Sequence, residues 1–378
     1  GILMHDMAER SEGGFAAYHA TRRFGSLDGL RFLCIMAVLW HHAPVWTGLA
    51  DPALILTRGF AGVDFFFVLS GFLITTLLVR ERRAKGRFSL RGFYWRRFLR
   101  IVPLYFLIVT AVAAYYIGVK KEMQYLEFLP FYYLFLSNFL IGDIPLLAPT
   151  WSLSVEEQYY LVWPLLLLVL PRRWVLPALV LGVVLCLLAV TGSLAPLGIR
   201  AVSVGPLVFY MFNATYAPIL IGSALAILLD DARGYAVLAR VLGHRAAPLA
   251  TFGLLLVLWQ ILPGNLIGWP NLVMHLSMAA CLASIVIRED HVLRPVLAFR
   301  PVARVGEISY GIYLYHLIGL HVTNVALGTT PQAGLAADWA VFVVYTLVTI
   351  AISEVSFRTF EQAFLRLKRR PVGLVRAA

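Results

Sequence analysis

Long apolar runs, separated by short basic or turn-rich stretches, dominate the chain. A membrane-spanning helix needs about 20 mostly apolar residues, and ten segments approach that length. An eleventh apolar stretch, 126–141, is ambiguous by pattern alone. The pattern predicts an all-α, polytopic helix bundle embedded in a membrane. The ten predicted spans are 28–46, 60–79, 101–118, 156–170, 174–191, 209–229, 248–263, 270–288, 308–328 and 338–357.

The distribution of Lys and Arg resolves the ambiguous stretch. If 126–141 does not cross the membrane and the N-terminus is cytoplasmic, the inner side carries 28 basic residues and the outer side 4. If the stretch crosses, the counts become 14 inside and 18 outside. Cytoplasmic loops of membrane proteins carry an excess of Lys and Arg. The sequence therefore predicts ten spans, two cytoplasmic termini and an extracytoplasmic segment at 119–155, whose partial re-entry into the membrane stays open.

Composition narrows the class of protein further. Hydrophobic residues make up 60% of the chain and charged residues 14%, against about 25% charged in a soluble domain. The net charge of +12, which would suggest nucleic acid for a soluble protein, here reflects the charge bias of the loops. Cys34, Cys186 and Cys281 lie in apolar runs without a zinc-ligand spacing, so we expect buried thiols and no metal. The expected organisation is a cytoplasmic segment at 1–24, a single membrane domain at 25–368 and a cytoplasmic basic tail at 369–378.

The first predicted span carries two ionisable side chains on one face. Arg31 and His42 are 11 residues apart, which is three helical turns plus about 20°, or about 16 Å along the axis. His41 is turned about 80° away from Arg31, which favours His42, although the tandem pair leaves open which imidazole acts. Ionisable groups inside a span mark candidate functional sites. The alternative is that Arg31 reaches the lipid headgroups and His42 bonds a backbone carbonyl.

Two carboxylates are expected near His42, at the outer ends of the second and fourth spans. Asp64 lies about 6 Å into the second span, at the same depth as His42, so the two could pair and fix the imidazole tautomer. Alternatively, Asp64 caps its helix. Glu156 opens the fourth span, where a carboxylate also suits the helix dipole. The pattern predicts an acid and imidazole cluster at the outer level.

The inner side is basic instead. Nine basic residues lie between positions 80 and 100, and Arg97 and Arg100 are spaced so that one helical face presents both to an anion. An ordinary cytoplasmic loop that contacts acidic lipid is the alternative. The whole arrangement suits a phosphate-rich donor that enters from the cytoplasm and reaches a base near the outer face. A secondary transporter or flippase of a glycan precursor is the main rival, but no inverted repeat is visible.

Six stretches of the chain also carry a family resemblance. They are LDGLRFLCIMAVLWHHA at 27–43, GFAGVDFFFVLSGFLITTLL at 59–78, FYWRRFLRIVPLY at 93–105, PTWSLSVEEQYYLVWP at 149–164, GEISYGIYLYHLI at 306–318 and FRTFEQAF at 357–364. In these stretches, and in their order, the chain resembles the acyltransferase-3 family of bacterial integral-membrane O-acyltransferases. Many members carry an arginine and an acidic residue in the span that corresponds to 209–229. This chain has no charge there, so we expect different acceptor contacts.

The resemblance implies a function and a set of site residues. It implies transfer of an acyl group, usually acetyl, from cytoplasmic acyl-CoA to a hydroxyl of a glycan, glycolipid or glycosylated small molecule at the outer side of the bacterial cytoplasmic membrane. Direct transfer and an acyl-histidine route both stay open. We expect no nucleic acid or metal, contact with membrane lipid, and a separate extracytoplasmic transferase for any two-step relay. The expected catalytic residues are His42, Asp64 and Glu156; the donor-binding residues are Arg31, Arg97 and Arg100; and the substrate-binding residues are Trp151, Tyr160 and His316.

Overall fold

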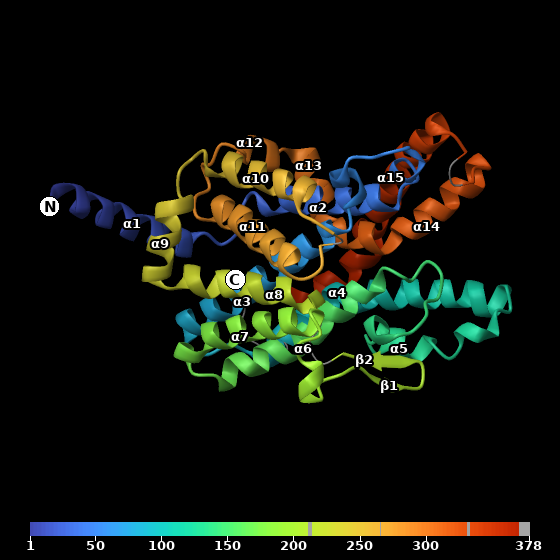
Figure 1. Cartoon of the computed structure of the whole chain (residues 1–378), viewed down its shortest axis with the longest axis horizontal. Coiled ribbons are helices and arrows are strands. Elements are labelled where there is room, and N and C mark those ends of the chain that lie inside the picture. The colour runs from blue at the N-terminus through green and yellow to red at the C-terminus, as the bar shows by residue number, and fades with distance from the viewer. Residues whose placement is uncertain (211–213, 265, 331–332, 370–378) are drawn as a thin grey trace.

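Helices make up most of the computed structural model, which describes residues 1–210, 214–264, 266–330 and 333–369 (Figure 1). The longer helices are α1 (Ile2–Ala20), α2 (Leu27–His42), α3 (Ala61–Lys85), α4 (Leu90–Ala113), α6 (Thr150–Val169), α7 (Arg172–Val190), α8 (Ala217–Asp230), α9 (Ala232–Leu242), α10 (Ala247–Ile261), α11 (Trp269–Val286), α14 (Ser309–Leu327) and α15 (Leu335–Ser356). The short elements are α5 (Leu129–Tyr133), α12 (Arg294–Leu297), α13 (Arg300–Glu307), α16 (Gln362–Leu365), and the paired strands β1 (Val202–Val204) and β2 (Leu207–Phe209).

Each of the ten predicted spans overlaps a helix. Within the described residues, five helices are long and apolar enough to cross a membrane, and a sixth qualifies if α8 and α9 count as one span despite a bend of 105° between them. This confirms an all-α membrane protein. The ten crossings and the cytoplasmic position of both termini stay predictions. The five helices are Ala61–Lys85, Leu90–Val119, Arg172–Val190, Trp269–Val286 and Leu335–Lys368.

The ambiguous stretch 126–141 does not form a single spanning helix. It contains only α5, of five residues, and a short 3₁₀ turn at Ser137–Phe139. Its last two residues bond to the β-hairpin: Leu140 forms a β-bridge with Leu207, and the Ile141 amide donates to the carbonyl oxygen of Pro206 in the turn between the strands. Non-helical backbone is tolerated at membrane depth only where protein or water covers it. If the stretch re-enters the membrane, the hairpin supplies part of that cover.

The N-terminal segment is more ordered than its sequence indicates. Residues 2–20 form α1, which projects from one end of the molecule beside α9 (Figure 1). Phe15 and Tyr18 on α1 pack against Tyr235 of α9. Arg80 of α3 donates to the carbonyl oxygens of Tyr18 and Thr21. Of the expected basic tail at 369–378, residues 370–378 lie outside the described part of the chain.

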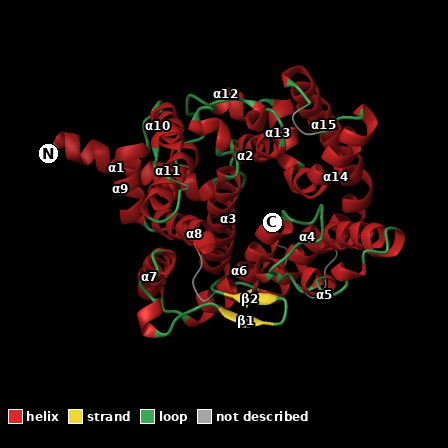
Figure 2. Cartoon of the chain, turned by 45° about the vertical axis from the view of Figure 1, so that its right-hand side comes forward, coloured by secondary structure: helices red, strands yellow, loops and turns green. Residues whose placement is uncertain are grey.

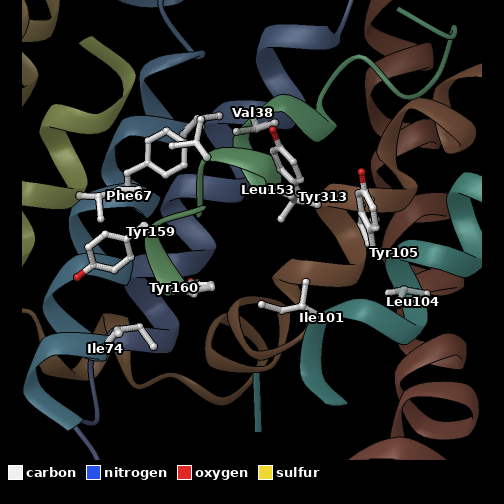
Figure 3. Close-up of a cluster of buried hydrophobic side chains, with 14 of the residues drawn as sticks. Val38, Phe67, Ile74, Ile101, Leu104, Tyr105, Leu153, Tyr159, Tyr160 and Tyr313 are labelled. Carbon is white, nitrogen blue, oxygen red and sulfur yellow. The ribbon is translucent and has the colours of Figure 1, made fainter. Parts of the chain in front are cut away.

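Two clusters of buried side chains share α2 and α3. One joins them to α4, α6, α14 and α15, and part of it is visible in Figure 3. The other joins them to α8, α10 and α11. Helix α3 lies very close to α8, because a Cβ atom added to Gly71 would stand 2.0 Å from the carbonyl oxygen of Ile219, and one added to Gly222 would stand 1.9 Å from that of Val68. Small residues permit such backbone approach in membrane helices. Helices α2 and α3 therefore form the centre of the bundle.

Candidate active site

Two adjoining cavities lie between the central helices and the helices that face them. Figure 2 shows α2 and α3 on one side and α4 and α14 on the other. The mouth cavity has a volume of about 560 Å³ and is lined by Arg80, Glu307, Glu361 and Arg366 among others. The deep cavity has a volume of about 510 Å³ and extends to Glu156, Ser152 and Tyr313. They adjoin because both are lined by Arg22, Arg23, Arg31, Leu73, Leu77, Arg100, Tyr310 and Lys368.

The three arginines expected to bind the donor all line the deep cavity. Arg31 is partly neutralised, because its Nη1 atom donates to the Asp28 carboxylate at 2.8 Å. The Arg97 guanidinium lies 5.7 Å from the centre of the Tyr160 ring. In the described part of the chain, neither Arg97 nor Arg100 has a hydrogen bond or an ion pair. Guanidinium groups without a protein partner are available to phosphate or carboxylate.

Glu156 lies on the arginine side of the site and not beside His42. It lines the deep cavity and accepts hydrogen bonds from the Ser70 hydroxyl at 3.1 Å and the Tyr160 hydroxyl at 3.4 Å. Helix α6 begins at Thr150, so Glu156 is about 9 Å inside the helix and not at its first turn. The expectation that Glu156 opens its helix is therefore wrong, because the helix begins six residues before the predicted span. The depth of Glu156 in the membrane stays a prediction.

Asp64 faces a different histidine from the one expected. Its Oδ2 atom lies 3.2 Å from Nε2 of His275, a buried residue of α11. It does not cap α3, whose N-terminus has no side-chain cap. No hydrogen bond joins Asp64 or Glu156 to His42 among the residues that the structure describes. The sequence paired Asp64 with His42 because the two lie at similar depths in their helices. The side of α3 on which Asp64 lies faces α11, so its carboxylate contacts His275 instead.

His42 is held in a defined orientation by its own helix. Its Nδ1 atom lies 2.9 Å from the carbonyl oxygen of Val38, so Nδ1 carries the proton and Nε2 is left with a free lone pair. The His41 ring stacks instead on Trp46 at 5.8 Å. The carbonyl bond that the sequence offered as an alternative to catalysis is thus present. It also prepares Nε2 to accept a proton, because the fixed tautomer leaves this atom unprotonated.

A second imidazole faces the first. The ring centres of His42 and His316 lie 4.6 Å apart. His316 is fully buried, its Nδ1 atom donates to the carbonyl oxygen of Tyr313, and its Nε2 atom has no partner in the described part of the molecule. From the sequence, we expected His316 to be less important than the other site residues, because an isolated histidine in an aromatic stretch is usually structural. The contact depends on the packing of α14 against α2, which the sequence did not reveal.

Tyr313 connects this histidine pair to the deep cavity. It lines the cavity, its hydroxyl donates to the carbonyl oxygen of Pro149 at 2.8 Å, and its ring centre lies 5.5 Å from that of His316. The residue is labelled near Leu153 and Val38 in Figure 3. Tyr160 also lines the cavity, whereas Trp151 packs edge-on against Phe67 behind the cavity wall. Sequence reasoning missed Tyr313 although it lies in one of the six matching stretches.

Comparison with known proteins agrees with the family resemblance. The family described as "Acyltransferase domain" matches residues 24–357. Peptidoglycan O-acetyltransferase OatA of Listeria monocytogenes is 29% identical over 362 residues, which cover 89% of this chain and 55% of the relative. O-acetyltransferase OatA of Staphylococcus aureus is 24% identical over 380 residues, which cover 91% of this chain and 57% of the relative.

The chain thus spans a little over half the length of the curated relatives that it matches. No solved structure matches it. The family match extends over most of the chain and includes Arg31, His42, Arg97, Arg100 and His316. The chain therefore belongs to the acyltransferase-3 family.

Proposed function

We propose that this protein is an acyl-CoA-dependent membrane O-acyltransferase. It moves an acyl group, most simply acetyl, from cytoplasmic acyl-CoA to a hydroxyl of a carbohydrate acceptor at the outer side of a bacterial cytoplasmic membrane. One observation carries the proposal: unpaired arginines line a cavity that reaches Tyr313, and Tyr313 packs against His316, whose ring faces His42 and its free Nε2 atom. The names of its relatives, which specify O-acetyl transfer and in one case peptidoglycan, support an acetyl donor and a glycan acceptor.

The chemistry of the cavity suits the two ends of acyl-CoA. Arg97 and Arg100 can bind its phosphates by charge-assisted hydrogen bonds, and Arg31 adds positive charge beside them. Farther in, the deep cavity is lined by apolar side chains such as Phe66 and Phe67, which suit a flexible, weakly polar arm. We propose that this arm extends along α2, so that the thioester reaches the level of Tyr313.

His42 supplies the base in this proposal. Its Nε2 atom takes the proton of the acceptor hydroxyl as the oxygen attacks the thioester carbonyl. The new C–O ester bond forms, the C–S bond breaks, and the departing CoA sulfur receives the proton from His42. General base assistance of this kind is typically worth about 10²–10⁴-fold in rate. His316 is close enough to support the imidazolium that forms during transfer.

A transfer assay with two histidine variants tests the proposal. Purified protein in liposomes is supplied with labelled acetyl-CoA on one side and soluble peptidoglycan oligosaccharides on the other. We expect His42→Ala to lose at least about 100-fold in transfer while still binding acetyl-CoA. His41→Ala is the matched control, since that ring stacks on Trp46, and we expect it to keep most of the activity. Transfer retained by His42→Ala would remove the base assignment.

A further inference from the structure

Residues outside the family match help to build the mouth of the site. The family match covers 24–357, yet Arg22 precedes it and Lys368 follows it, and both line the mouth cavity and the deep cavity. They come from opposite ends of the described chain. The short helical turn at Arg366–Arg369, which carries Lys368, packs against α4. The donor site thus has basic walls that the family's shared segment does not supply.

Several basic residues of the mouth already have protein partners. Arg23 forms an ion pair with Asp28 at 2.9 Å, and Arg31 pairs with the same carboxylate. Arg80 is bound by two backbone carbonyls of the N-terminal segment. These three cations hold the entrance together, so they are less available to a ligand.

Arg22 and Lys368 differ from that group. Both are exposed, and neither has a hydrogen bond or an ion pair within the described ranges. Lys368 also lies close enough to Arg97 and Arg100 for mutual repulsion. The mouth also contains Glu307, which pairs with Arg304, and Glu361, which accepts a hydrogen bond from the Ser356 hydroxyl. Cations without an ion pair of their own repel one another, and an anionic ligand reduces that repulsion. The mouth is therefore suited to a second anionic group beside the one bound by Arg97 and Arg100, of which Arg97 lines the deep cavity alone.

We propose that Arg22 and Lys368 bind the 3′-phosphate of acyl-CoA, while Arg97 and Arg100 bind its diphosphate. This inference rests on the proposed function. The 3′-phosphate is at the end of the donor farthest from the thioester, and the mouth is at the end of the cavities farthest from His42. A phosphomonoester carries about −1.5 to −2 charges near neutral pH, so it is the donor group that gains most from two unpaired cations.

A binding cycle isolates this contact. The affinities of the purified wild type for CoA and for dephospho-CoA, which lacks only the 3′-phosphate, are compared with those of Arg22→Gln/Lys368→Gln. We expect the wild type to bind CoA about tenfold more tightly than dephospho-CoA, and the double variant to bind the two about equally. The control is Arg91→Gln/Arg300→Gln, which removes the same charge from two exposed residues that do not line either cavity. It should keep the preference.

The outcomes separate this inference from the function on which it rests. If the folded wild type binds neither compound, the proposed function fails and the inference fails with it. If the wild type binds both equally, or if the double variant keeps the wild-type preference, only the 3′-phosphate assignment is overturned. If both double variants lose the preference to the same extent, the effect comes from overall charge, and the assignment to Arg22 and Lys368 is wrong.

Discussion

Two arginine-rich regions of the molecule differ in whether their cations have partners. At one, the buried Asp230 carboxylate binds Arg172 at 3.0 Å and Arg83 at 3.2 Å, which joins α3, α7 and α8. His19 of α1 stands 3.9 Å from the same carboxylate. At the other, Arg97 and Arg100 line a cavity and have no such partner among the described residues. A count of basic residues cannot distinguish these regions. Whether each guanidinium has a carboxylate partner does distinguish them. The paired arginines stabilise the fold, and the unpaired ones are available to an anionic ligand.

The largest effect should follow from removing the two unpaired arginines of the cavity. Arg97→Ala/Arg100→Ala removes two charge-assisted contacts, each worth about 1.5–3 kcal/mol, so we expect acetyl-CoA affinity to fall by about 100-fold or more. The thermal midpoint of unfolding should stay the same or rise, because mutual repulsion is relieved. Equilibrium binding and thermal unfolding in detergent measure the two effects. Loss of folding without loss of affinity would show that these arginines belong to the structural group.

The next largest effect should follow from removing the carboxylate that binds the two paired arginines. Asp230→Ala leaves Arg83 and Arg172 without their carboxylate. Because these arginines are about half exposed (49% and 46%), we expect a loss of about 1–3 kcal/mol in the free energy of unfolding. The acetyl-CoA affinity of the folded fraction should not change. Asp290→Ala, which removes an exposed carboxylate, is the control and should alter stability by less than about 0.5 kcal/mol.

A smaller effect should come from removing the carboxylate partner of two arginines at the cavity, which then become unpaired. Asp28 neutralises both Arg23 and Arg31 at the edge of the cavity. Asp28→Asn keeps the shape of the side chain and removes its charge, so two further cations become available to the donor. We expect acetyl-CoA to bind a few-fold more tightly, by about 2–5-fold, with a small loss of stability. Unchanged binding would mean that the two released cations do not contact the donor, and weaker binding would mean that Asp28 positions Arg31.

The smallest effect concerns His291, a buried neutral histidine beside Arg294, which pairs with Glu289. His291 accepts a hydrogen bond from the Leu293 amide at Nδ1 and contacts the Ser26 hydroxyl through Nε2 at 2.7 Å. Burial, helped by repulsion from Arg294, lowers the pKa of His291 to about 4. The unfolded imidazole therefore binds a proton first as the pH falls from about 6.5 toward 4. Stability should decrease across that window, by at most about 1.4 kcal/mol per pH unit.

The pH effect has its own control. His291→Asn removes the titrating group, so its thermal midpoint should change less between pH 6.5 and pH 4 than that of the wild type. Equal pH dependence in the two proteins would assign the change to other groups. Stability that increases toward pH 4 in the wild type relative to the variant would contradict the sign of the effect.

The helices of the fold could be predicted because the bilayer leaves the backbone few choices. Within lipid, polar backbone groups must bond internally, so apolar runs such as 60–79 and 270–288 became helices. Charge counting also predicted that 126–141 would not span. Helix α1 and the bend of 105° between α8 and α9 were missed. They depend on packing and on surface position, and hydropathy does not encode either.

The site could be predicted in part. Arg31, Arg97 and Arg100 were expected together and line one cavity. Spacing gives the position of a residue along its helix, but it does not give the neighbour that it faces, so Asp64 was assigned to His42 and lies against His275. For Glu156, the predicted span began six residues after the start of α6, so the residue lies inside the helix and not at its first turn. The contact between His42 and His316 joins two helices far apart in sequence, and no local pattern predicts it.

Direct binding of acetyl-CoA to the detergent-purified protein tests the central claim most directly, because it needs no knowledge of the acceptor. Wild type and His42→Ala are titrated side by side, with thermal unfolding used to confirm that both are folded. The account predicts saturable binding of similar affinity by both, because the cations that bind the donor are separate from the imidazole that acts on it. Absence of binding by the folded wild type would contradict the acyltransferase proposal.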